Sequence, residues 1–173
     1  MSAFAKLRRF SEDGPRIPMA ERILRSDEQQ ARVDIVREAR EWLNTPYHPH
    51  ARLKGVGVDC LTLVVEVLER VGVIEHQEIG HYSPEGHLHQ SEDLWKPVVE
   101  LYAREMELPP ARLPKPGDLV LYRVAKAFNH NAIVIEWPVV IHAHIDHGVL
   151  LADAERDPQL RFGCRERAVF SLW

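Results

Sequence analysis

The chain has 173 residues, of which 45% are hydrophobic and 28% charged, and its net charge is −4 at pH 7. These values are typical of one globular domain with its own hydrophobic core, and the acidic balance argues against nucleic-acid binding as the main task. The two cysteines, Cys60 and Cys164, are too few for a disulfide framework. Neither a signal segment nor a run of 18 apolar residues is found, so we expect synthesis in the cytoplasm and no membrane span.

The N-terminal part of the chain predicts an arm followed by a helix. Residues 1–25 mix charges with glycine and proline without periodicity, so we interpret them as an arm before a single domain over residues 26–173. Ser26 and Gln29 have the spacing of a capping box. Apolar residues at helical spacing then predict a helix over residues 27–43; they are Val33, Val36, Ala39 and Leu43.

A second helix is predicted from Asp59 or Cys60 to Arg70, because apolar residues cover most of its surface and Gly72 is a natural stop. Cys60 stands at its start. A cysteine there faces unpaired backbone N–H groups and the positive end of the helix dipole, which favour thiolate over thiol. The alternative is a small buried side chain at the start of a core helix.

The rest of the chain predicts a loop, a third helix and then a series of short strands. Residues 74–93 are polar and rich in histidine, which predicts a long surface loop of the kind that often carries binding surfaces, and residues 92–107 predict a third helix. After the turn at residues 117–118, short β-rich runs follow at 119–124, 132–136, 139–143, 149–152 and 168–172. Helices followed by an antiparallel meander predict an α+β domain.

A cysteine nucleophile needs a base, and the base needs an orienting partner. His130 begins a β-rich run, which the turn at residues 136–138 folds back on the next one. If these two strands pair antiparallel, His130 lies opposite His142 or His144, which point to the same face of the sheet. The spacing does not choose between the two. All three histidines could equally be ordinary rim residues.

Histidine side chains could also bind a metal ion. The spacing of the histidines and the neighbouring aspartate matches no standard zinc signature, so we expect no metal ion and no other cofactor. The residues concerned are His48, His50, His142, His144, Asp146 and His147.

Five motifs, taken together and in order, resemble the NlpC/P60 cysteine peptidases over roughly residues 30–145. They are Trp42–Tyr47, Lys54–Cys60, Pro116–Val120, His130 and Ile141–Ala143. The pattern is most similar to the subgroup encoded with phage tails and gene transfer agents, described as phage cell-wall peptidases. The resemblance implies a papain-like α+β fold, in which the nucleophile heads a helix that packs on an antiparallel sheet.

The resemblance also implies residue roles. Cys60 would be the nucleophile, His130 the general base and His142 the polar third residue. Tyr47 would line the site, and Asp59 would help to hold the amino end of the substrate. Members of this family mostly cleave peptidoglycan stem peptides between D-glutamate and the diamino acid.

The chain departs from the family pattern directly after the nucleophile. Leu61 and Thr62 follow Cys60, where many members have serine and glycine. Because the serine is expected to contact substrate, this departure concerns substrate preference more than mechanism. It also motivates two alternatives, which are a non-catalytic tail-assembly protein that keeps the fold and a papain-like amidase or esterase acting on another small substrate. No wall-binding module is visible, so we expect phage-tail or gene-transfer-agent proteins as partners that carry the protein to the cell wall.

Overall fold

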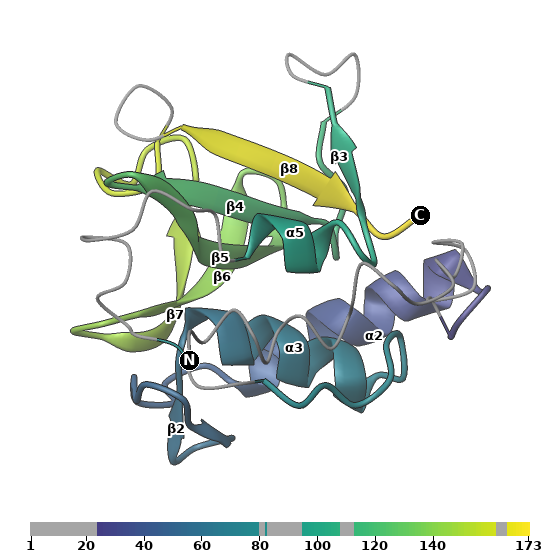
Figure 1. Cartoon of the computed structure of the whole chain (residues 1–173), viewed down its shortest axis with the longest axis horizontal. Coiled ribbons are helices and arrows are strands. Elements are labelled where there is room, and N and C mark those ends of the chain that lie inside the picture. The colour runs from purple at the N-terminus through teal and green to yellow at the C-terminus, as the bar shows by residue number, and fades with distance from the viewer. Residues whose placement is uncertain (1–23, 80–81, 83–94, 108–112, 162–165) are drawn as a thin grey trace.

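The computed structural model describes residues 24–79, 82, 95–107, 113–161 and 166–173, and it shows helices packed on an antiparallel sheet (Figure 1). The helices are α2 (Glu28–Glu41), α3 (Cys60–Arg70) and the short α5 (Lys96–Val99). The strands are β1 (Arg52–Leu53), β2 (Gly57–Val58), β3 (Arg104–Met106), β4 (Leu119–Val124), β5 (Ala127–Glu136), β6 (Val139–His144), β7 (Gly148–Asp153) and β8 (Arg167–Ser171). The predicted α+β class is confirmed.

The main sheet has six strands in the order β3-β8-β4-β5-β6-β7, and its neighbouring strands are antiparallel. The five predicted β-rich runs are all strands. β5 is longer than predicted and begins at Ala127, because its pairing with β4 continues through His130 and, beyond an irregularity between Tyr122 and Arg123, to Phe128 and Ala127. β1 and β2 form a separate two-stranded ribbon in the loop that leads to α3.

Helices α2 and α3 pack against each other on one side of the sheet, and both contact β5 (Figure 1). Eight consecutive residues, Leu61 to Leu68, are buried, as the nearly continuous apolar surface of this segment predicted. Gly72 ends the helix with a φ of 68°, a left-handed conformation that glycine adopts without strain. Within the described residues, no helix is long and apolar enough to cross a membrane.

Two predictions about local structure are wrong. The predicted third helix is only the single turn α5 followed by strand β3, because Arg104–Met106 pairs with the edge of β8 instead of continuing the helix. The predicted capping box at Ser26 and Gln29 is absent, since Asp27 is the N-cap residue of α2 and its side chain binds Arg25. The predicted arm up to residue 23 and most of the predicted loop 74–93 lie outside the described residues.

A buried ion pair joins α2 to the sheet. Arg32 Nη1 lies 2.8 Å from Asp118 Oδ1, and the Asp118 side chain is 0% exposed. The guanidinium also donates to Pro116 O at 2.7 Å and to Ser171 Oγ at 3.1 Å. Arg32 therefore connects the start of β4 and the end of β8 to the helix, and its donors are largely satisfied where water is excluded.

We predict that Asp118→Ala lowers the free energy of unfolding by about 3–5 kcal/mol, because it leaves the Arg32 charge buried without its carboxylate. Chemical denaturation measures the change. The matched control is Arg37→Ala, which removes an ion pair to Asp34 in which the Arg37 side chain is 68% exposed. This control should change the free energy of unfolding by less than about 1 kcal/mol. Equal effects of the two variants would contradict the role given to the buried pair.

Candidate active site

The cysteine thiol is placed by the cap of helix α3. Asp59 is the N-cap residue, and its Oδ1 accepts hydrogen bonds from the backbone N–H groups of Leu61 at 3.0 Å and Thr62 at 2.9 Å. The Thr62 hydroxyl in turn accepts from the backbone N–H of Asp59 at 2.9 Å. This reciprocal capping box fixes Cys60 as the first residue of the helix, where backbone N–H groups have no partner within the helix.

Cys60 lies where strands β5 and β6 separate. Their pairing ends at Ile133 and Ile141. The backbone N–H of Val134 donates to the carbonyl of Asp118, on the β4 side of the strand. Because backbone groups alternate along a strand, those of residues 129, 131 and 133 face the β6 side. Cys60 Sγ approaches this edge and lies 3.5 Å from the carbonyl oxygen of Asn129. The thiol is therefore held next to His130 along the strand.

Burial raises the pKa of the Cys60 thiol to about 12, and the neighbouring Asp59 carboxylate acts in the same direction. The backbone N–H groups of Asn131, Cys60 and Leu61 act in the opposite direction. The helix terminus thus has the predicted effect on the thiol, but burial outweighs it. Burial of this partly exposed side chain therefore favours the thiol over the thiolate.

The two predicted partner histidines contact each other. His130 Nε2 lies 2.9 Å from His142 Nδ1, and the ring planes are nearly perpendicular. His142 is 2% exposed. Burial lowers its pKa to about 4, with His144 adding to the effect, so its imidazole is neutral at neutral pH. A neutral imidazole offers one donor and one acceptor, which suits a partner that orients another histidine.

His144, the alternative partner, is engaged elsewhere. Its Nε2 lies 2.9 Å from Gln159 Oε1, and its Nδ1 accepts from the backbone N–H of Asp146 at 3.1 Å. Its ring stacks on His147 with 4.8 Å between the centroids. In the described part of the chain, no three histidine, cysteine or acidic side chains are grouped so that they could hold a metal ion.

Tyr47 and Asp59 lie beside the thiol. Tyr47 is half-buried, and its pKa is raised by burial and by the charges of Cys60 and Asp59. Asp59 is buried, and its Oδ2 accepts from the backbone N–H of His50 at 2.8 Å and from the hydroxyl of Tyr82. The structure therefore gives Asp59 a capping role, and its contact with substrate stays a prediction. Tyr82 was not predicted, because nothing distinguishes a single tyrosine within a polar segment.

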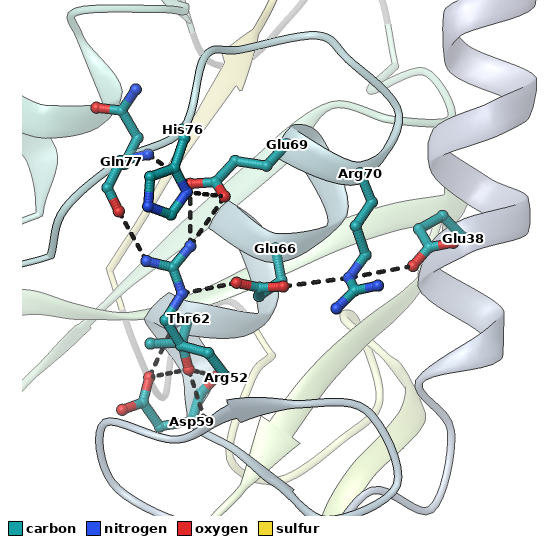
Figure 2. A network of polar contacts seen from close by, with 9 residues as sticks. All are labelled: Glu38, Arg52, Asp59, Thr62, Glu66, Glu69, Arg70, His76 and Gln77. Atoms are coloured by element: carbon teal, nitrogen blue, oxygen red, sulfur yellow. Dashed lines mark hydrogen bonds and ion pairs between the residues drawn. The ribbon is translucent and has the colours of Figure 1, made fainter.

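A polar network holds the loop before the cysteine against α3 (Figure 2). Arg52 lies 2.6 Å from Glu66 Oε1 and 3.0 Å from both carboxylate oxygens of Glu69. It also donates to the carbonyl of Gln77 at 2.7 Å. Because these partners are largely shielded from water, the network fixes the loop that leads from Tyr47 to the capped helix.

The NlpC/P60 family matches residues 44–160, and the chain belongs to this family. Its fold is accordingly papain-like, with the cysteine at the start of a helix. No curated protein matches the sequence.

Solved structures show the same fold at low identity. The NlpC/P60 domain of the peptidoglycan hydrolase SagA is 20% identical with a TM-score of 0.54, over 80% of this chain and 97% of that one. The peptidoglycan hydrolase RipB of Mycobacterium tuberculosis is 20% identical with a TM-score of 0.56, over 98% of this chain and 80% of that one. NlpC1 of Trichomonas vaginalis is 14% identical with a TM-score of 0.55, over 82% of this chain but 43% of its own.

We predict that His142 makes folding stability depend on pH. Its imidazole takes up a proton near pH 6.5 in the unfolded chain but only near a pKa of about 4 in the folded protein. The unfolded state therefore gains a proton first, and stability falls as the pH drops between these values. The difference in pKa corresponds to about 3 kcal/mol.

Denaturation of wild type and His142→Asn across this pH range measures the effect. The variant should lose less stability on acidification than the wild type, whereas His147→Asn, at an exposed site, should behave like the wild type. A wild type and a His142→Asn variant with parallel pH profiles would contradict the burial of a neutral imidazole.

Proposed function

We propose that this protein is a cysteine peptidase that hydrolyses amide bonds in the stem peptides of peptidoglycan. The observation that carries the proposal is the hydrogen bond between His130 and His142. His130 lies on the segment of β5 that the Cys60 thiol contacts. Membership of the NlpC/P60 family supports it. The structurally similar proteins SagA and RipB are both described as peptidoglycan hydrolases.

The first step of the proposed reaction is attack by the thiol. Because burial favours the protonated thiol of Cys60, His130 takes its proton as the sulfur bonds to the amide carbon. The carbonyl oxygen becomes negative and accepts a hydrogen bond from the backbone N–H of Cys60, since the N–H groups of Leu61 and Thr62 are bound to Asp59. His130 then gives the proton to the departing amine, which leaves a thioester on Cys60. A water molecule activated by His130 hydrolyses the thioester and restores the thiol.

His142 would orient the base without exchanging the proton itself. When His130 is an imidazolium, both of its ring nitrogens are donors, so its Nε2–H must donate to Nδ1 of His142. His142 can accept there only if it is neutral and carries its own proton on Nε2. Burial, which lowers the pKa of His142 to about 4, keeps it in that form during the reaction.

The finer proposals rest on the motif resemblance. We propose the bond between D-glutamate and the diamino acid as the target, and assembly into a phage-like particle as the route to the cell wall. We also propose that the substrate preference of this protein differs from that of many family members. The Thr62 hydroxyl is used in the capping box, so it does not replace the serine that many members have after the cysteine. Tyr47 and Asp59 would border the substrate site.

We predict that Cys60→Ala and His130→Ala each lower kcat for cleavage of purified muropeptides by at least about a thousandfold, because each removes one member of a unit that acts together. Chromatography of the products measures the rate. The control is His144→Ala, whose imidazole is bound to Gln159 and which should retain activity. Undiminished cleavage by Cys60→Ala, with unchanged thermal unfolding, would refute the proposal.

Alkylation separates a catalytic thiol from a structural one. We predict that His130→Ala slows the reaction of Cys60 with iodoacetamide at neutral pH, because burial raises the pKa of the thiol and the variant lacks the base that would take its proton. Labelling is measured by mass spectrometry of the Cys60 peptide, with His144→Ala as the control. A non-catalytic protein would show the same labelling rate with and without His130.

A further inference from the structure

A cavity of about 60 Å³ lies between α3, α5, β4 and β5. Its walls are almost entirely apolar, and they include Leu61 at the start of α3, Trp95 before α5, and Val99. Leu61 follows Cys60 directly, so the cavity adjoins the candidate active site, but the proposed mechanism does not use it. An apolar cavity with one placed polar group is the usual form of a small-molecule site.

Asn131 supplies that polar group. It lines the cavity and is 2% exposed, and neither Oδ1 nor Nδ2 of its side chain has a hydrogen-bond partner among the described residues. A carboxamide offers both acceptors and donors, and leaving them unpaired away from water is unfavourable. The residues beside it in the sheet, Leu121 and Ile133, are apolar, so packing alone would favour an apolar side chain at this position.

We propose that this cavity binds a short, neutral aliphatic amide, free or as part of a peptide, through the carboxamide of Asn131. An amide carries one donor and one acceptor in a plane, so it can satisfy both orphan atoms of Asn131 at once. At about 10–15 Å³ for each heavy atom, the cavity accommodates about four to six heavy atoms.

The charge of the walls favours a neutral ligand. Among the described residues that line the cavity, the charged one is Glu78, which is exposed at the rim. A carboxylate ligand would therefore enter an apolar site with no cation to pair with and an anion nearby, which is strongly unfavourable. An amide of the same shape avoids this penalty.

The test uses isobutyramide, a branched amide, and isobutyrate, its charged analogue of equal shape. Each is titrated into the full-length wild-type protein, and binding is followed in proton–nitrogen correlation spectra. We expect isobutyramide to shift the side-chain amide signal of Asn131 and the indole N–H signal of Trp95 in a saturable way. Isobutyrate should bind at least about tenfold more weakly.

Two variants complete the test. Asn131→Leu fills the wall with apolar atoms and should weaken isobutyramide binding at least about tenfold, followed by the Trp95 signal. Asn129→Leu is the matched control, because Asn129 lies on the same strand but does not line the cavity. Absence of saturable binding, equal binding of isobutyrate, or unchanged affinity in Asn131→Leu would each overturn the proposal. The isobutyrate comparison needs no variant and remains decisive if Asn131→Leu does not fold.

Discussion

The carboxylate of Asp59 organises the candidate active site. Its Oδ1 caps α3 through Leu61 and Thr62, and its Oδ2 binds the backbone of His50 and the hydroxyl of Tyr82. One buried side chain thus fixes the start of the helix, the loop before it and a distant segment of the chain. Because Cys60 is the next residue, any shift of this cap would move the thiol away from the edge of β5.

The second constraint is the separation of β5 from β6. A continuous ladder would have used the backbone of Asn129 and Asn131 for strand pairing. Instead the pairing stops at Ile133, and these groups face Cys60 Sγ. The histidines of both strands remain near this opening, and their hydrogen bond connects the strands beyond their last backbone pair. The end of the β5–β6 pairing and the hydrogen bond between the two histidines therefore lie at the same place.

Periodicity predicted most of the fold. The continuous apolar surface of α3 and the short β-rich runs of the five strands are strong local signals, so their positions followed from sequence. The predicted helix over residues 92–107 failed, because pairing of Arg104–Met106 with β8 is a long-range contact that local spacing does not contain. The ion pair between Arg32 and Asp118 was missed for the same reason, since 86 residues separate its partners.

The sequence indicated which residues could form the candidate site, but it contained no signal for their electrostatics. Parity on β6 left His142 and His144 equivalent, and the motif resemblance alone favoured His142. Their contacts differ, because His144 binds Gln159 whereas His142 binds His130. A helix terminus predicted a low thiol pKa, but the burial that raises it comes from the surrounding sheet and loop. The unpaired carboxamide of Asn131 likewise has no signature in the sequence.

The tautomer of His142 is the most direct test of the proposed mechanism, which requires this residue to accept a hydrogen bond from His130. Long-range proton–nitrogen correlation spectra of the histidine rings distinguish the two neutral tautomers from the imidazolium. At neutral pH we expect a neutral His142 with its proton on Nε2. A proton on Nδ1, or a charged ring, would contradict it, because His142 could then no longer accept from His130 Nε2.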